Sequence, residues 1–377
     1  MGGDCAFSKS SAGTRTLKRL LFSGYYGYGN AGDEAVLAGL VTGFRAALSA
    51  TDLDLTALSG SPAETRSLHG IHAADRYRPA SLLPAIARCD LFLSGGGSLL
   101  QDVTSAHGIF YYLGVVKMAQ MLGKKTMFIA QGIGPLTLPR SRKLVAAVAN
   151  NLSAITVRDE ESSKLLREIG VSRPPIEVTA DPALLLFPPA LNTGGGRIRG
   201  TNESFGVALR PWPGHGQIGT EVAAACASLA GQRPRLLPMQ PGHDTEVSEQ
   251  FAGEWARRCV SSPTPEVFAA ADGFTSLLLT IGRCDMMVGM RLHALILAAA
   301  AGVPSVALSY DPKVTAFMQA SGQSDAVYDL NVLNADSLTE MVGRVWAERA
   351  QRAAALEAAL PGLRAKAQRN VDVVLGI

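Results

Sequence analysis

The chain has 377 residues, of which 47% are hydrophobic and 18% are charged. A single hydrophobic core stops growing at about 250–300 residues, so this length predicts two domains of similar size. The sequence contains 35 Lys and Arg against 32 Asp and Glu, a formal net charge of +3. That balance argues against a nucleic-acid partner, whose binding depends on neutralising phosphates. The low charge also excludes disordered chains and coiled coils.

The cysteines and the N-terminus indicate a soluble protein of the cytoplasm. The five cysteines are scattered without a CxxC pair, which favours reduced thiols over a disulfide framework or a zinc site. Residues 1–16 lack the apolar segment of a secretory signal and are expected to be a disordered lead-in. The apolar stretch from Leu292 to Leu308 is divided at Gly302 and Pro304. It therefore predicts a buried helix and strand rather than a membrane span.

Short apolar runs alternate with amphipathic helical patterns along the whole chain. This pattern is typical of parallel sheets covered by helices on both faces. It predicts an α/β fold with two Rossmann-like, doubly wound domains facing each other across a cleft. The expected strands are 19–23, 53–58, 91–94, 126–130, 154–157, 177–179, 205–210, 235–239, 286–288 and 305–309, and the clearest helices are 34–48, 109–122, 141–152 and 160–169.

A polar, glycine-containing segment at residues 191–204 is expected to link the two domains. It separates an N-terminal domain at 17–190 from a C-terminal domain at 205–334. Residues 335–377 have a helical pattern, and Pro361 followed by Gly362 is expected to interrupt it. We expect these C-terminal helices to pack back on the N-terminal domain.

Three glycine-containing loops follow strands of the N-terminal domain. Such loops bring backbone amides close to a ligand, although turns of this kind are routine in α/β folds. The first loop fits neither GxGxxG nor the Walker motif, and its acids disfavour a phosphate at the helix N-terminus. A cradle for sugar hydroxyls and a plain strand–helix turn both remain open. The candidate acceptor-binding residues are Asn30, Gly32 and Asp33 in the first loop, Gly95, Gly96 and Gly97 in the second, and Gln131 and Gly132 in the third.

Arg291 and His293 open an apolar helix directly after a strand, and Arg210 ends another apolar strand. The helix dipole disfavours cations at that position unless an anion compensates them. Arginine forks grip carboxylate and phosphate groups, so these residues indicate a site for a small, highly charged anion. The alternative is an interdomain salt bridge in which His293 is a satisfied, partly buried side chain. The sequence has no HExxH or carboxylate cluster for a metal and no GxSxG nucleophile elbow.

Six segments in order resemble the polysaccharide pyruvyl transferase family, and the resemblance is closest to the bacterial CsaB-type branch that acts on cell-surface polymers. They are GYYGYGNAGDEAVL, SGGGSLLQD, AQGIGPL, VRDEES, ADPALLL and VGMRLHALILAAAAGVP. The resemblance implies a fold similar to GT-B glycosyltransferases and transfer of pyruvate from phosphoenolpyruvate to a sugar of a cell-surface polysaccharide or its lipid-linked precursor. A cyclic pyruvate ketal and phosphate would be the products, with no metal or cofactor needed.

By position, the resemblance implies that Arg210, Arg291 and Leu292 hold phosphoenolpyruvate and that His293 is the catalytic acid. Lys313 is grouped with the donor-binding residues, and Asp33 or Glu34 is the candidate acceptor of the hydroxyl proton. The glycan acceptor is expected to face the N-terminal loops. A lipid-linked acceptor implies peripheral contact with the cytoplasmic membrane.

Two other functions remain open. A GT-B glycosyltransferase would share the fold but use a nucleotide-sugar, and a non-enzymatic protein would only bind an anionic metabolite. Anion binding alone does not require an imidazole beside two arginines, which favours the enzyme. Basic residues such as Arg140, Arg142 and Lys143 are candidates for contact with a membrane, although a solvated face is the simpler explanation for them.

Overall fold

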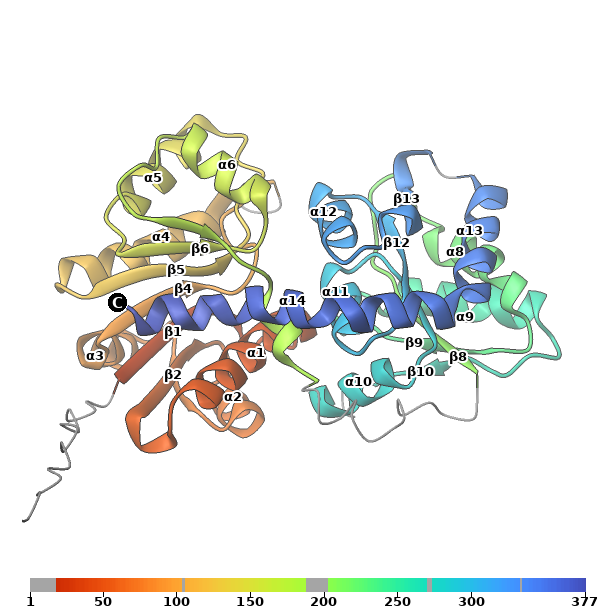
Figure 1. The fold of residues 1–377 in the computed structure, drawn as a ribbon, viewed down its shortest axis with the longest axis horizontal. Helices are drawn as coiled ribbons and strands as arrows, with labels where there is room; N and C mark the ends of the chain where they lie inside the picture. The colour runs from red at the N-terminus through yellow and green to blue at the C-terminus, as the bar shows by residue number, and fades with distance from the viewer. Residues whose placement is uncertain (1–17, 104–105, 188–202, 270–272, 333) are drawn as a thin grey trace, which may run out of the picture.

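The computed structural model describes residues 18–103, 106–187, 203–269, 273–332 and 334–377. Two parallel sheets lie side by side, each covered by helices (Figure 1). This architecture confirms the predicted α/β class with two doubly wound halves. The lead-in expected at 1–16 and most of the linker expected at 191–204 lie outside the described residues.

The first sheet has seven parallel strands in the order β3-β2-β1-β4-β5-β6-β7. Neighbouring residues of its strands pack on opposite faces. Leu21 and Phe92 pack with α3 to α6, whereas Phe22 and Leu93 pack with α1 and α14. The strands are β1 (Lys18–Tyr26), β2 (Leu53–Ser59), β3 (His72–Asp75), β4 (Leu91–Gly95), β5 (Lys125–Gln131), β6 (Ala154–Val157) and β7 (Ile176–Val178). The helices are α1 (Ala31–Ala47), η1 (Ala50–Asp52), α2 (Pro62–His69), α3 (Pro79–Arg88), α4 (Ala106–Met121), α5 (Pro139–Ala149), α6 (Glu160–Glu168) and η2 (Pro182–Leu185).

The second sheet has six parallel strands in the order β10-β9-β8-β11-β12-β13. Its core is one continuous cluster that includes most of α11, which is apolar on all sides. The strands are β8 (Ser204–Ala208), β9 (Arg233–Leu236), β10 (Glu266–Val267), β11 (Met286–Gly289), β12 (Ser305–Ser309) and β13 (Val327–Asp329). The helices are α8 (Ile218–Cys226), η3 (Ala227–Leu229), α9 (Thr245–Arg258), α10 (Gly273–Gly282), α11 (Leu292–Ala300), α12 (Pro312–Ala320), η5 (Ser324–Ala326) and η6 (Leu330–Val332).

The C-terminal segment forms α13 (Ala335–Ala347) and the long helix α14 (Arg349–Leu375), which runs across both sheets in Figure 1. The expected interruption at Pro361 is wrong, because α14 continues through it. Proline removes one backbone hydrogen bond, but Leu360 and Leu363 on either side are buried and hold the helix in place. The actual break lies at Glu348, between α13 and α14.

The strand order of each sheet fixes where a ligand can bind. In the first sheet the order reverses between β1 and β4, and in the second between β8 and β11. Ligands of open α/β sheets bind outside the carboxyl ends of the strands at this reversal. The sequence pattern missed β3, β10 and β13 because these strands are short and lie at or next to a sheet edge. In the described residues, no helix is both long and apolar enough to cross a membrane.

Candidate functional site

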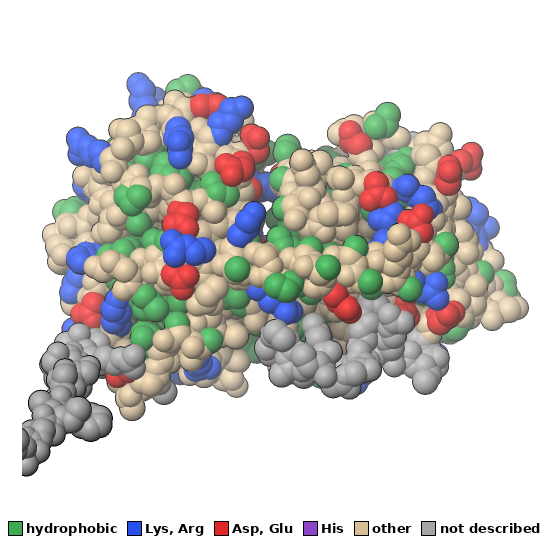
Figure 2. All heavy atoms as spheres, in the orientation of Figure 1, with side chains coloured by type: hydrophobic (Ala, Val, Ile, Leu, Met, Phe, Trp, Pro, Cys, Tyr) green, Lys and Arg blue, Asp and Glu red, His purple; other side chains and the backbone are tan. Residues whose placement is uncertain are grey.

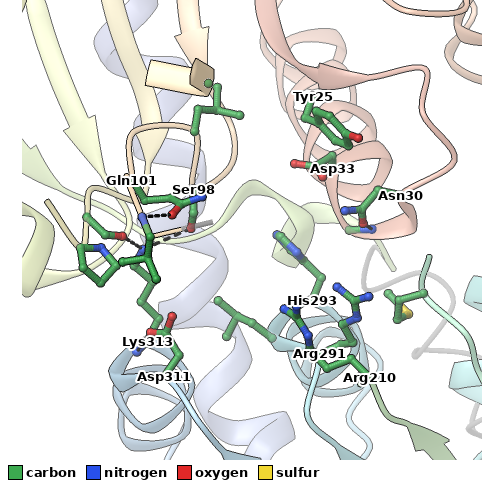
Figure 3. Close-up of a pocket in the computed structure, with 18 of the residues that line it drawn as sticks. Tyr25, Asn30, Asp33, Ser98, Gln101, Arg210, Arg291, His293, Asp311 and Lys313 are labelled. Carbon is green, nitrogen blue, oxygen red and sulfur yellow. Dashed lines mark hydrogen bonds between the residues drawn. The ribbon is translucent and has the colours of Figure 1, made fainter. Parts of the chain in front are cut away.

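A cleft of about 820 Å³ lies between the two domains, at the carboxyl ends of the four strands that flank the two reversals. It opens between the two halves of the molecule in Figure 2. Each domain contributes side chains to it, and Figure 3 shows them approaching from opposite sides. The lining includes Asn30, Gly32, Asp33, Ser98 and Arg158 from the N-terminal domain and Arg210, Arg291, Leu292, His293 and Lys313 from the C-terminal domain.

His293, in the first turn of α11, reaches across to the N-terminal domain. Its ring packs against Gly32, and its Nε2 lies 3.2 Å from Nη1 of Arg158 and 3.5 Å from Oδ2 of Asp181. The side chain is 18% exposed and lines the cleft. The alternative of an interdomain contact with a carboxylate is therefore realised for His293, while the ring also borders the space where a ligand would lie.

Arg158 and Asp181 form a buried ion pair behind His293. Nη1 of Arg158 lies 2.5 Å from Oδ2 of Asp181, and the two side chains are 5% and 3% exposed. Burial alone would raise the pKa of Asp181, but the charge of Arg158 and hydrogen bonds from His293 and Ala183 N–H hold it well below its usual range. Asp181 therefore stays ionised beside the imidazole of His293.

Asp33 is the carboxylate of the N-terminal domain that borders the cleft. Its neighbour Asn30 caps α1 by accepting a hydrogen bond from the Gly32 N–H at 3.0 Å. Burial raises the pKa of Asp33 to about 7, and the charge of Glu34 adds to the rise, while His293 and Arg158 oppose it. A carboxyl group with such a pKa can accept a proton near neutral pH.

The structure does not bring Glu34 to the cleft. Its Oε2 lies 2.8 Å from Nε2 of His69, and its Oε1 accepts a hydrogen bond from the Gly27 N–H at 2.7 Å. Both Glu34 and His69 are buried. Glu34 thus holds the first glycine loop in shape, because adjacent residues of a helix point about 100° apart, so that Glu34 faces away from the cleft that Asp33 borders. The expectation that Glu34 accepts a substrate proton is not supported by this placement.

The glycines expected to bind the acceptor in the second and third loops lie beneath the cleft, while other residues of these loops form part of its wall. Gly95, Gly96, Gly97, Gln131 and Gly132 are all buried and are not among the residues that line the cleft. The Gly97 carbonyl accepts hydrogen bonds from Nε2 of Gln131 at 3.1 Å and from the Gly132 N–H at 2.9 Å. The two loops therefore bind each other, and the residues they present to the cleft are Ser98, Leu99, Gln101, Gly134 and Pro135. Gly97 also leaves room for Asp33, since a Cβ there would lie 2.9 Å from Oδ1 of Asp33.

Arg291 has an anionic partner within its own domain. Asp244 is fully buried, and both of its carboxylate oxygens accept hydrogen bonds from the Arg291 guanidinium. The conflict between the arginine and the helix dipole is thus resolved by Asp244 and not only by a ligand. Arg291 still lines the cleft, but its charge is already balanced.

Arg210 and Lys313 are the other two cations that the C-terminal domain contributes to the cleft. In the described part of the chain, neither forms a salt bridge with a carboxylate. Arg210 packs against the rings of Trp212 and Tyr310, with its Cζ 5.6 Å and 5.4 Å from the ring centroids, and its buried Nε has no hydrogen-bond partner. Burial, together with the charge of Arg158, lowers the pKa of Lys313 to about 8. Its Nζ donates to the Gly134 carbonyl and to Oγ of Ser98.

The other end of the cleft is lined by five tyrosines around one arginine. Arg76 is 2% exposed and donates to the Gly24 carbonyl at 2.7 Å and to the Tyr111 hydroxyl at 3.2 Å. Its Cζ lies 4.6–5.8 Å from the centroids of four tyrosine rings, which is within cation–π range. The rings present apolar faces with hydroxyls at their edges. The tyrosines are Tyr25, Tyr28, Tyr77, Tyr111 and Tyr112.

Sequence reasoning missed Arg158, Asp181 and Asp244 as site residues. Arg158 follows β6 and Asp181 follows β7, so both lie at the carboxyl edge where the cleft was expected. Two of the family-like segments contain them, and that was the available signal. Asp244 follows a loop after β9 and carries no comparable signal. Among the described residues, no group of three or more His, Cys, Asp or Glu side chains is arranged to hold a metal ion.

Comparison with known proteins agrees with this site. The family model described as polysaccharide pyruvyl transferase matches residues 30–312, which is most of the chain and includes every cleft residue except Tyr25, Tyr28, Lys313 and Val314. The chain belongs to the polysaccharide pyruvyl transferase family. The amylovoran biosynthesis protein AmsJ of Erwinia amylovora is 20% identical, over 87% of this chain and 92% of that protein. The chain is thus related to a protein of exopolysaccharide biosynthesis.

Solved structures with the same fold bind nucleotide-sugars. Anabaena Alr3699/HepE in complex with UDP-glucose has a TM-score of 0.61 at 14% identity, covering 95% of this chain and all of that one. The UDP-GlcNAc 2-epimerase of Neisseria meningitidis bound to UDP-GlcNAc has a TM-score of 0.58 at 12% identity, covering 96% of this chain and all of that one. At such identities the likeness shows the fold alone, and it agrees with the predicted GT-B-like architecture of this pyruvyl transferase family member.

Proposed function

We propose that this protein transfers pyruvate from phosphoenolpyruvate to a sugar of a cell-surface polysaccharide or its lipid-linked precursor, forming a cyclic pyruvate ketal and releasing phosphate. The observation that carries the proposal is the position of His293 in a cleft with two cations, Arg210 and Lys313, that form no salt bridge with any carboxylate of the described residues. Phosphoenolpyruvate carries one carboxylate and one phosphate. Two such cations match these groups, and the buried Nε of Arg210 is a donor ready for one of them.

The tyrosine-lined end of the cleft supports a sugar as the second substrate. Aromatic faces pack against the apolar faces of sugar rings, and hydroxyls at the ring edges can bond to sugar hydroxyls. Asp33 lies between this end and His293. The donor would therefore bind on the side of the C-terminal domain and the acceptor on the side of the N-terminal domain, with Asp33 and His293 where they meet.

The chemistry assigned to these residues is acid–base catalysis. His293 donates a proton to the methylene carbon of phosphoenolpyruvate, which gives C2 cationic character. A sugar hydroxyl forms a bond to C2 while Asp33 takes its proton. Phosphate then leaves with the electrons of the bond between C2 and the phosphate oxygen. A second hydroxyl of the same sugar then attacks C2 and closes the ketal. Of the two protons released by the hydroxyls, one restores the proton that His293 gave and the other protonates the phosphate.

The test is to incubate the protein with phosphoenolpyruvate and a panel of nitrophenyl and lipid-linked glycosides, and to follow phosphate release and the mass of the glycoside. We expect one product heavier by a pyruvate ketal, with one phosphate released for each. His293→Gln should lower turnover by roughly 10²–10⁴-fold, with phosphoenolpyruvate affinity by calorimetry retained. His72→Gln, which changes an exposed histidine of β3, is the matched control. Near-normal turnover by His293→Gln would refute its role as the acid.

The same panel separates this function from glycosyl transfer. A GT-B glycosyltransferase would bind a uridine nucleotide and transfer a sugar without any need for phosphoenolpyruvate. Binding of uridine diphosphate together with sugar transfer, and no phosphate release from phosphoenolpyruvate with any acceptor, would overturn the proposal. Phosphoenolpyruvate binding without turnover on the whole panel would instead support a protein that only binds the anion.

A further inference from the structure

One stretch of the sequence is cationic without any acid. Between residues 103 and 157 there is no Asp or Glu, while six Lys and Arg are present in a chain whose net charge is only +3. Three of the six are engaged within the domain fold, because Lys124, Lys125 and Arg142 donate hydrogen bonds to backbone carbonyls. The other three, Lys117 on α4 and Arg140 and Lys143 on α5, are exposed.

Exposed apolar side chains gather on the same stretch. Of the eleven large hydrophobic residues that are exposed in the described part of the chain, five lie between 103 and 138. Two of them belong to α4: Phe110 is 54% exposed and Met121 is 77% exposed. Scattered exposed hydrophobics need no explanation, but this concentration within 36 positions does.

The two helices also form an apolar groove of about 350 Å³. On α4 its wall consists of Phe110, Leu113, Gly114 and Lys117, at the i, i+3, i+4 and i+7 spacing of one helix face, and Met121 continues this face by one turn. On α5 the wall consists of Leu144, Ala147 and Val148, with Arg140 and Lys143 one turn before it. We call the exposed side chains Lys117, Met121, Phe110, Arg140 and Lys143 the α4–α5 surface.

We propose that the α4–α5 surface binds an anionic phospholipid bilayer, with Phe110 and Met121 inserted at the headgroup level and the three cations on the lipid phosphates. Apolar side chains beside cations, with no acid among them, are the combination that binds an anionic interface. In Figure 2, Lys and Arg side chains stand at the upper left edge of the first domain, and Asp and Glu side chains follow them toward the gap between the two halves. A second copy of this chain fits poorly here, because a two-fold contact would set the cations against each other.

The surface is joined to the cleft through α4. Tyr111 and Tyr112 on this helix line the tyrosine end of the cleft, while Phe110 and Leu113 line the groove. Binding to a bilayer through α4 and α5 therefore brings that end of the cleft toward the membrane. The membrane inference does not depend on the proposed reaction, since vesicle binding requires neither donor nor acceptor.

Cosedimentation with vesicles tests the inference. We expect the full chain to sediment with vesicles of phosphatidylcholine containing phosphatidylglycerol, to stay in solution with phosphatidylcholine alone, and to be released by salt. Changing Lys117, Arg140 and Lys143 together to Gln should weaken binding by roughly tenfold or more. The matched control changes three exposed cations elsewhere, Arg88, Arg173 and Lys366, to Gln. Equal binding by the two triple variants, or no binding by the parent chain at low salt, would overturn the inference.

A second variant set tests the apolar part. Phe110→Ser with Met121→Ser should reduce vesicle binding and leave thermal stability unchanged, because both side chains are exposed. Phe110→Trp should report insertion directly, through a shift of its emission to shorter wavelength and quenching by brominated lipids. A tryptophan that is not quenched by bound vesicles would overturn the insertion of this residue. A dimer in the absence of lipid that Phe110→Ser with Met121→Ser abolishes would assign the surface to a second copy instead.

Discussion

A methyl group on Gly32 would come within 2.3 Å of Nδ1 of His293. The absence of a side chain at the start of α1 is thus what lets the imidazole of the opposite domain reach the cleft. Gly32→Ala should displace His293 and lower turnover by roughly a hundredfold, while the fold is kept, since alanine suits a helix better than glycine does. Steady-state kinetics together with thermal unfolding measures both effects.

The control for this prediction is Gly253→Ala. Gly253 is also helical, within α9, and an added methyl group there meets no atom within 4 Å. It should leave turnover unchanged and stability equal or slightly higher. If Gly32→Ala behaves in the same way, the contact between the two domains at His293 does not matter for activity.

Stability should depend on pH through Asp33. Its pKa of about 7 in the folded protein lies above the ordinary 3.8, so the folded chain keeps a proton that the unfolded chain releases between about pH 4 and 7. This contribution is fully present below pH 4 and is lost as pH rises through 7. Asp33→Asn removes the loss, so the variant should exceed the parent in unfolding free energy by up to about 4 kcal/mol at pH 8.

Urea unfolding at pH 5 and pH 8 tests this prediction, because the advantage of Asp33→Asn should shrink toward acid pH. Titrating groups that do not interact with Asp33 are common to the two proteins and cancel in the comparison. The same difference in unfolding free energy at both pH values would contradict the raised pKa.

Breaking the buried ion pair of Arg158 and Asp181 should strongly lower the free energy of unfolding. Asp181→Asn leaves the Arg158 guanidinium buried without a charged partner and should destabilise the protein by about 3–5 kcal/mol. The exposed pair of Arg19 and Asp90 offers a control, with side chains 46% and 43% exposed. Asp90→Asn should cost no more than about 1 kcal/mol. Urea unfolding compares the two, and equal costs would show that the Arg158–Asp181 pair is solvated.

Affinity for phosphoenolpyruvate should fall as pH rises through 8. Lys313 has a pKa of about 8 in the free protein, owing first to burial and then to the charge of Arg158. Above that pH Lys313 is neutral in the free protein, so it must take up a proton when the anion binds. The phosphate group is already fully ionised there, so the change reports the protein. Calorimetry at pH 7.5 and 9.5, in two buffers of different ionisation heat, measures affinity and proton uptake.

Lys313→Arg is the informative variant for this dependence. Arginine stays charged throughout this pH range, so its affinity should change little between the two pH values. A parent protein whose affinity is equally flat would show that Lys313 does not contact the anion. The comparison needs no acceptor and is unaffected by the identity of the sugar.

The alternation of apolar runs and helical patterns was enough to predict the two sheets, because strands buried on both faces leave a continuous apolar signal in the sequence. Pro361 misled because sequence reasoning assigns it the cost of a broken helix, while the packing of Leu360 and Leu363 outweighs that cost. Loops after successive parallel strands were expected to share an edge, and they do. Which side chain of α1 faces the cleft depends on the rotation of about 100° between adjacent residues of a helix, and this separates Asp33 from Glu34.

The partner of Arg291 could not be read from the sequence either. Asp244 lies 47 positions away in the chain, and only the folding of β9 beside β8 brings the two together. Arg158 and Asp181 could be noticed in the sequence only because they belong to segments that resemble the family. A residue's distance from a strand end is encoded locally, whereas the balance of charges around it is set by tertiary structure.

Helix α14 runs across both domains and forms hydrogen bonds with each of them. Asn370 near its end accepts hydrogen bonds from Thr156 and Thr179 of the first sheet, while Arg364 donates to carbonyls of Leu184 on one side and Ala300 on the other. A single helix is thus bonded to the first domain and, through one guanidinium, to a carbonyl of each domain. His293 belongs to one domain, and its neighbours Arg158 and Asp181 belong to the other. Any change in the angle between the domains would therefore change the contacts of His293 together with the width of the cleft.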